Sequence, residues 1–181
     1  GHLTAQMTEA LESGNDWQLL LDPDDPDQQT ILFYYPQTTT ETAGYVKPTI
    51  KLEFGARGGT EPQNETPIRS YVSEEFPALF PEASCSPVTL SVTRSFWEKA
   101  TILHALCHGS KMKDRMSRHY YDTFMMDQKG VTEAALTDTA LLDLVVQNKT
   151  YFFRDPKASY DTAKIGTLRL VPEGKTLQAL K

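Results

Sequence analysis

The sequence predicts an α+β protein, with an antiparallel or mixed sheet in its first half followed by a helical second half. Short runs rich in β-branched and aromatic residues, separated by turn residues, lie mainly in residues 3–93. Apolar residues at helical spacing lie mainly in residues 94–181. We therefore expect a single domain made of these two parts. Residues 1–2, Gly-His, resemble an expression scar.

The composition indicates an ordinary globular protein that is large enough for a sizeable core. The chain has 181 residues, of which 39% are hydrophobic and 23% are charged, and its formal net charge is -6. A negative net charge argues against indiscriminate binding of nucleic acid, because such surfaces are usually basic. Cys85 and Cys107 are far apart in sequence, which favours free thiols in a reducing cytoplasm. Neither a membrane span nor a signal peptide is recognisable.

The first segments predict a helix, a strand and an acidic turn. Leu3 to Ser13 has apolar residues at helical spacing, and Trp17 to Leu21 has the composition of a short strand. Four aspartates follow within Asp22 to Asp27, which raises the alternative of a calcium loop. That loop needs glycine at its sixth position and a carboxylate at its twelfth, where this sequence has Asp27 and Phe33. We favour a solvated turn, because Asp-Pro pairs start turns without an ion.

Two strand-like runs predict an antiparallel hairpin. Thr30 to Tyr35 and Tyr45 to Phe54 are rich in β-branched and aromatic residues. In the second run, apolar residues at positions 50, 52 and 54 alternate with polar residues at 49, 51 and 53. We therefore expect one buried face, with Glu53 on the opposite face. The glycine-rich segment Gly55 to Gly59 is suited to bringing the backbone close to another element.

The next region predicts two further strands with irregular connections. Pro62 to Pro67 is rich in turn residues, whereas Ile68 to Val72 and Val88 to Thr93 are strand candidates. The segment between them, Glu74 to Pro87, contains three prolines and is expected to be irregular.

A helical hairpin from Ser95 to Asp122 is the feature around which the rest is organised. Ser95 and Glu98 form a capping box, and Gly109 is a suitable end of the first helix. At 100° per residue the first helix has one apolar stripe, made of Phe96, Ala100, Leu103 and Cys107. Its predicted outer face comprises Glu98, Thr101 and Ala105.

Three charged residues of this hairpin are candidate functional groups. Lys99 falls at the edge of the apolar stripe, an unusual place for a lysine without a partner. Arg118 and Asp122 share a face of the second helix. Its apolar set is Tyr120, Tyr121, Phe124 and Met125. The alternative is a lysine that extends towards solvent and an ordinary helical ion pair.

The loop between these helices has a local excess of basic residues. Ser110 to Ser117 contains Lys111, Lys113 and Arg115 against the single acid Asp114. A run of charges is usually a solvated loop. Basic side chains before a helix N-terminus are also a common way of binding phosphate, so both interpretations stay open.

Histidines of the hairpin raise the alternative of a zinc site. His104 and His108 have the spacing of a zinc-binding pair, with Cys107 between them. The catalytic glutamate of metalloproteases and a clear third ligand are missing, so we disfavour zinc. For His119 we expect a surface position rather than a part in phosphate binding.

The remainder of the chain predicts helices with an extended segment between them. Thr139 to Phe153 is broadly apolar and is expected to be a buried helix. Ser159 to Ala163 predicts a helical turn, Thr167 to Val171 an extended segment, and residues 175–181 the opening of a helix.

Three runs of the sequence resemble the bacterial AbiEii/AbiGii nucleotidyltransferase toxin family. They are VKPTIKLEFGAR at 46–57, TRSFWEKA at 93–100 and SRHYYD at 117–122. The resemblance covers most of residues 17–172, and the runs occur in the family's order. It implies a DNA polymerase β-like nucleotidyltransferase fold and transfer of nucleotides from a nucleoside triphosphate with Mg²⁺. It also implies an RNA acceptor, which is tRNA in characterised relatives, and a cognate antitoxin.

The resemblance assigns roles to individual residues. Glu53 resembles the family's third acidic position, which binds metal. Lys99 matches the lysine expected to contact the triphosphate. Arg118 and Asp122 match the last motif, in which the aspartate assists catalysis. The basic loop residues Lys113 and Arg115 are expected to bind phosphate as well.

The chain departs from the family pattern at the metal-binding motif. Relatives have a Gly-Ser or Gly-Gly-Thr turn followed by an Asp-x-Asp pair, and the acidic turn at residues 22–27 lacks the glycines. We therefore expect a fragment that lacks this N-terminal motif and is itself inactive. The alternative is a non-catalytic domain that binds an antitoxin or RNA. A shared sheet without its N-terminal part would expose an edge strand, so we also expect self-association through that edge.

Overall fold

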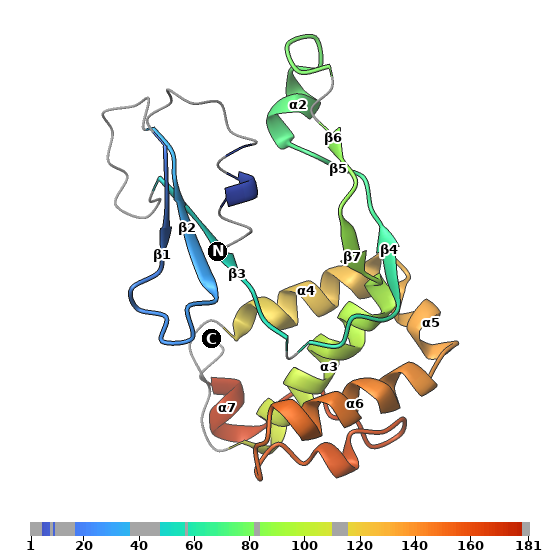
Figure 1. Ribbon diagram of the computed structural model, residues 1–181. Coiled ribbons are helices and arrows are strands. Elements are labelled where there is room, and N and C mark those ends of the chain that lie inside the picture. Colours follow the sequence, from blue (N-terminus) through green and yellow to red (C-terminus); the bar gives the residue numbers. More distant parts are fainter. Residues whose placement is uncertain are drawn as a thin grey trace. The chain divides into compact units, whose positions relative to one another are not determined.

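The computed structural model shows the predicted α+β class, with antiparallel sheets in the first half and helices in the second (Figure 1). It consists of two compact units, Gly1–Arg57 and Gly58–Lys181. The residues that the structure describes are 5–7, 9, 17–36, 48–56, 58–81, 84–109 and 116–178. Most of the helix expected at residues 3–13 lies outside them. No helix in these ranges is long and apolar enough to cross a membrane.

The first unit contains a three-stranded antiparallel sheet. Its strands are β1 (Gln18–Leu21), β2 (Thr30–Tyr34) and β3 (Thr49–Glu53), with β2 in the centre. This confirms the predicted strands and the hairpin. Leu32 of β2 faces Leu20 on one side and Lys51 on the other.

The buried face predicted for β3 is not observed, because burial does not alternate along this strand. Ile50 is 49% exposed and Phe54 is 46% exposed. On the opposite face Lys51 Nζ lies 3.5 Å from Glu53 Oε1, as expected for polar residues two positions apart in a strand.

The acidic segment between β1 and β2 forms the predicted turn. The Asp22 carboxylate accepts the backbone N–H of Asp24 at 3.0 Å, and Asp25 accepts those of Asp27 and Gln29. Aspartate side chains that bond to the backbone two residues further on stabilise such turns. The N–H of Asp24 and the ammonium of Lys51 lower the pKa of Asp22.

The second unit begins with a two-stranded arm. In it β4 (Gln63–Glu65) pairs with β7 (Val88–Leu90), and β5 (Ile68–Arg69) pairs with β6 (Ser84–Cys85). Sequence reasoning missed β4 and β6, and it extended both strand candidates of this region too far. The candidate from Ile68 to Val72 stops because the Ser70 hydroxyl accepts the N–H of Ser73 and so starts α2 (Tyr71–Glu75).

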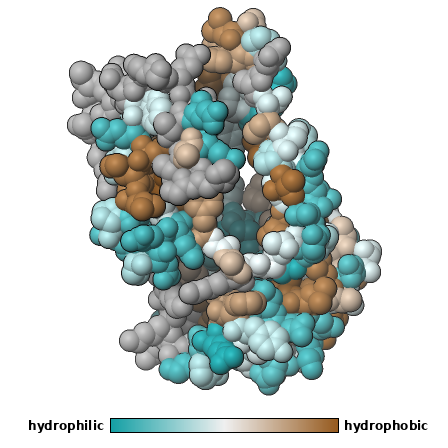
Figure 2. Space-filling view, in the orientation of Figure 1, coloured by the Kyte–Doolittle hydropathy of each residue, from teal (hydrophilic) through white to brown (hydrophobic). Residues whose placement is uncertain are grey.

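The outer end of the arm exposes many apolar side chains, visible as brown atoms at the top of Figure 2. Tyr71 is 89% exposed and Leu79 is 73% exposed. The other large exposed apolar residues here are Ile68, Val72, Phe76, Phe80 and Val88.

Helices form the rest of the second unit. They are α3 (Val92–His108), α4 (Ser117–Gln128), α5 (Val131–Leu136), α6 (Ala140–Phe152), the 3-10 turn η1 (Tyr160–Thr162) and α7 (Gly174–Gln178). The sequence did not indicate α5. Helices α3, α5 and α6 enclose the core, whose buried members are Phe96, Trp97, Ala100, Val131, Ala135, Leu141, Leu142 and Val145.

Helix α3 starts earlier than predicted and is buried on more than one side. Its N-cap is Ser91, whose hydroxyl accepts the N–H of Arg94, so the expected capping box at Ser95 is wrong. Thr101, expected on the outer face, is completely buried and donates to the Trp97 carbonyl. The reason is that α3 packs against α4, α5, α6 and η1, so little of its surface stays free.

His104 connects α3 to the C-terminal segment. Its Nε2 lies 3.0 Å from the carbonyl oxygen of Ser159, and its Nδ1 accepts the backbone N–H of Arg169 at 3.0 Å. A carbonyl only accepts, so Nε2 holds the proton and the ring is neutral. Both nitrogens are occupied, which leaves none for a metal, and the described residues contain no group of three metal-binding side chains.

Stability is expected to fall in acid because of this histidine. Burial lowers the pKa of His104 in the folded state, whereas the unfolded chain has the ordinary value of 6.5. As the pH falls below 6.5, His104 gains a proton in the unfolded state but not in the folded state. The free energy of unfolding therefore decreases. The loss is at most about 1.4 kcal/mol per pH unit for one histidine. Urea denaturation at pH 7, 6 and 5 measures it.

The variant His104→Gln isolates this contribution from the carboxylates that also titrate. It is expected to be less stable at pH 7 but to lose less stability between pH 6.5 and 5. Equal losses in both proteins over that range would contradict the assignment.

Candidate active site

An ion pair joins two of the residues that sequence analysis singled out. Lys99 on α3 and Asp122 on α4 meet with Nζ 2.7 Å from Oδ2. Their side chains are 24% and 38% exposed, so the pair is accessible from solvent. The pair explains why a lysine tolerates the edge of an apolar stripe.

The other predicted cations are not part of this pair. The expected helical pair between Arg118 and Asp122 does not form, because Asp122 is occupied by Lys99. Arg118 is exposed and has no ion pair within the described part of the chain. Lys113 and Arg115 lie outside the described residues.

A buried carboxylate beside Lys99 binds two other cations. Glu98 Oε1 lies 3.1 Å from Arg94 Nη2, and Glu98 Oε2 lies 2.6 Å from Lys149 Nζ of α6. Arg94 and Lys149 are only 5% and 10% exposed, and Lys149 also lies over the Phe153 ring. Since both oxygens of Glu98 are taken, Lys99 has Asp122 as its partner instead.

Arg94 also fixes the loop that leads into the arm. Its guanidinium donates to the carbonyl of Glu61. A Cβ atom at residue 59 would lie 2.0 Å from Arg94 Nη2, so any side chain there would require the Arg94 guanidinium to move. This confirms for Gly59 the expected close approach of backbone to another element.

His119 is buried, which corrects the predicted surface position. It is 9% exposed, and its Nδ1 is buried without a partner in the described residues. Burial lowers its pKa, and the nearby cations Lys99 and Arg118 lower it further. The imidazole is therefore neutral at pH 7. Asp122 follows His119 by three residues, so both side chains lie on the same face of α4.

Two open cavities meet at Lys99. The first, which we call the His119 cavity, has a volume of about 320 Å³. Residues that line it include Gly59, Lys99, Ile102, His119, Asn148 and Phe153. The second, the Met126 cavity, has a volume of about 450 Å³. It is lined by Lys99, Asp122, Met125, Met126, Lys129 and Val131, among others.

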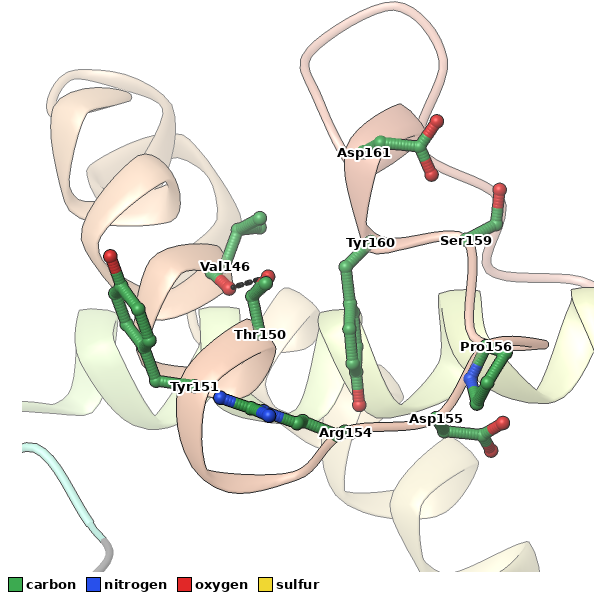
Figure 3. Close-up of a pocket in the computed structure, with 9 residues that line it drawn as sticks. All are labelled: Val146, Thr150, Tyr151, Arg154, Asp155, Pro156, Ser159, Tyr160 and Asp161. Atoms are coloured by element: carbon green, nitrogen blue, oxygen red, sulfur yellow. Dashed lines mark hydrogen bonds between the residues drawn. The ribbon is translucent and has the colours of Figure 1, made fainter.

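A larger cavity of about 640 Å³ lies between the end of α6 and η1 (Figure 3). Tyr151, Arg154 and Tyr160 line it, and Thr150 donates to the Val146 carbonyl in its wall. None of the residues predicted to be functional lines this cavity.

Glu53 belongs to the first unit. There Lys51 Nζ lies 3.1 Å from Asp22 Oδ2 and 3.5 Å from Glu53 Oε1, so one ammonium is shared by two carboxylates and these three groups keep a net negative charge. Glu53 is 72% exposed.

Residues 4–180 match the sequence profile of the family described as nucleotidyl transferase AbiEii toxin, type IV toxin–antitoxin system. The chain belongs to this family. The match spans Lys99 and Asp122 and confirms the family predicted from the resemblance. Comparison with curated proteins and with solved structures gives no match.

Membership of the AbiEii family implies the use of metal ions in general. Two-metal chemistry needs several carboxylates around the ions. The described residues contain no such group, and Glu53 is already paired with Lys51. These residues thus do not form a metal site by themselves.

Two glutamates test the importance of the buried ion pairs. Glu98→Ala leaves Arg94 and Lys149 without their carboxylate, and we expect the free energy of unfolding to fall by about 3 kcal/mol. Glu173 pairs with Arg169 at the same four-residue spacing, but its side chain is 82% exposed. Glu173→Ala should therefore cost less than about 0.5 kcal/mol. Similar losses for both variants in urea denaturation would contradict this view.

Proposed function

We propose that the AbiEii-family protein to which this sequence belongs acts in the bacterial cytoplasm as a toxin that transfers a nucleotide from a nucleoside triphosphate to an RNA acceptor such as tRNA. We propose as well that this chain, which lacks the family's glycine turn with its Asp-x-Asp motif, is inactive by itself. The observation that supports this proposal is the ion pair of Lys99 and Asp122, 2.7 Å apart and bordering two cavities. A cation for phosphate and a carboxylate for a hydroxyl are two of the groups that nucleotidyl transfer uses, besides the carboxylates that hold metal ions.

In the proposed reaction the acceptor hydroxyl oxygen attacks the α-phosphorus of the triphosphate. A new oxygen–phosphorus bond forms, and the bond to the leaving pyrophosphate breaks. Asp122 receives the hydroxyl proton, and Lys99 donates hydrogen bonds to the phosphate oxygens, where negative charge accumulates. Arg118 on the same helix, with Lys113 and Arg115, supplies further positive charge for the phosphates.

Glu53 stays a predicted ligand of Mg²⁺. Only its Oε1 contacts Lys51, at 3.5 Å, and its side chain is 72% exposed. We assign no step of the reaction to the metal on the basis of the described residues.

A non-catalytic role in binding an antitoxin or RNA is the second candidate. It is favoured by the apolar side chains at the outer end of the arm, where Tyr71 and Leu79 are largely exposed. Activity measurements separate the two candidates. A non-catalytic binding domain transfers no nucleotide, whereas the enzyme should lose transfer when Lys99 or Asp122 is replaced.

Substitution of the ion pair is the test of the enzyme. In the intact protein, Asp122→Asn is expected to lower transfer of labelled nucleotide to RNA at least 100-fold, because the proton acceptor is lost. Lys99→Ala is expected to weaken binding of the triphosphate about 10-fold. Both variants should lose less than about 1 kcal/mol of stability, since the pair is partly exposed.

Two exposed residues of the same charges serve as controls. Lys157→Ala and Asp138→Asn keep the ion pair and should leave transfer unchanged. Full transfer by Lys99→Ala or Asp122→Asn would refute the proposed roles.

We also propose that the chain associates with itself through the edges of its arm. Strands β5 and β6 form a two-stranded ladder within the described residues, so each has an edge that can pair with another chain. Size-exclusion chromatography should show concentration-dependent elution. Ile68→Lys on β5 should shift it towards the monomer, whereas Leu144→Lys on α6 should not. A strictly monomeric protein at high concentration would contradict this proposal.

A further inference from the structure

We propose that the His119 cavity binds the nucleobase of the nucleoside triphosphate, with His119 and Asn148 as its hydrogen-bonding groups. The inference rests on the proposed nucleotidyl transfer and adds the site of base recognition to it. Sequence reasoning gave Asn148 no role, because an asparagine in an apolar helix has no distinguishing pattern.

Unpaired polar atoms beside the cavity are the first observation. His119 Nδ1 and Asn148 Oδ1 are both buried, and neither has a hydrogen-bond partner in the described residues. The two residues come from α4 and α6, and both line the His119 cavity. Buried polar atoms in native proteins nearly always have partners. We take two residues with unpaired atoms beside one cavity as the sign of a ligand whose hydrogen-bonding groups would pair with them.

The hydrogen-bonding groups of the cavity favour a base over a phosphate. The Lys149 ammonium is already paired with Glu98 at 2.6 Å, and burial lowers the pKa of His119, which favours the neutral imidazole. A neutral imidazole and a carboxamide each offer a donor and an acceptor. Phosphate oxygens only accept, so they would leave the Asn148 oxygen unpaired. The edges of nucleobases present donors and acceptors together.

The walls of the cavity suit a flat ring. Leu90 and Ile102 contribute apolar surface, and Phe153 contributes an aromatic ring. The Lys149 ammonium lies 4.7 Å from the centre of that ring. Apolar walls with a few hydrogen-bonding groups are typical of small-molecule sites.

The position of Lys99 connects the base to the reaction. Lys99 borders both the His119 cavity and the Met126 cavity, whereas Asp122 lines only the latter. A base in the first cavity places its phosphates beside the Lys99 ammonium. The Met126 cavity then stays open for the acceptor hydroxyl next to Asp122.

Equilibrium binding to the intact protein tests this inference. The probes are the four nucleoside triphosphates, inorganic tripolyphosphate, which has no base, and the four nucleosides, which have no phosphate. The variant Asn148→Leu removes the amide, and Ile102→Trp fills the cavity. Gln147→Leu makes the same change at the exposed neighbouring residue and is the matched control. Thermal unfolding identifies any variant that fails to fold.

The expected result is selective. Asn148→Leu and Ile102→Trp should each weaken binding of at least one triphosphate 10-fold or more, with tripolyphosphate changed less than twofold. Gln147→Leu should change neither. Weaker binding of the corresponding nucleoside to Asn148→Leu supports the base site independently of any phosphate contact.

Other results separate the two proposals. If Lys99→Ala weakens triphosphates and tripolyphosphate while Asn148→Leu and Ile102→Trp weaken nothing, the base site is refuted and the proposed function stands. If nucleosides bind and respond to Asn148→Leu but tripolyphosphate does not bind, the phosphate role of Lys99 is refuted and the base site stands. Absence of binding by every probe refutes both.

Discussion

The double pairing of Glu98 is the interaction on which the second unit depends. The carboxylate pairs with a guanidinium from its own helix and with an ammonium from α6. All three side chains are largely removed from water. Burying these charges is costly unless each finds an opposite charge, so the three groups constrain one another. Arg94 transmits the constraint to the loop at Glu61, and Lys149 transmits it to the Phe153 ring. One side chain thereby connects α3, α6 and the base of the arm.

The same pairing determines what Lys99 can do. Two lysines and one arginine lie close to Glu98 and Asp122, and the structure divides them between these two carboxylates. The buried carboxylate receives two cations. Asp122, the more exposed carboxylate, pairs with Lys99 alone, and solvent and ligands can reach this pair. Lys99 in such an accessible pair can exchange its internal partner for another anion that enters from solvent.

Local patterns predicted the elements but not their environments. The alternation in β3 and the apolar stripe of α3 were sufficient to place both elements, because each period reflects a single face. The helix start was misplaced, since Ser91 and Ser95 both have the composition of a cap and only the surrounding contacts select between them. Thr101 was expected to be exposed because it lies away from the apolar stripe at 100° per residue, and His119 because a surface position is usual for histidine. Packing of several helices around α3 and α4 buried both.

The candidate site was only partly predictable for a similar reason. Lys99 and Asp122 each stood out, one by its place on a stripe and the other by the resemblance. Their pairing spans 23 residues and follows from how two helices cross, which no local period encodes. Asn148 lies still further along the chain and became visible only through an unsatisfied oxygen.

Gly59 illustrates how such contacts restrict the variation of a sequence. Gly55, Gly58 and Gly59 are equivalent by composition, and an added Cβ at either of the first two meets no described atom within 4 Å. At the third it would collide with Arg94. A side chain at residue 59 would therefore move the Arg94 guanidinium away from Glu61 and Glu98, whereas a side chain at residue 55 or 58 would disturb no described contact. We expect this loop to tolerate substitution less well at Gly59 than at its other glycines, and the cause is Arg94 rather than the turn itself.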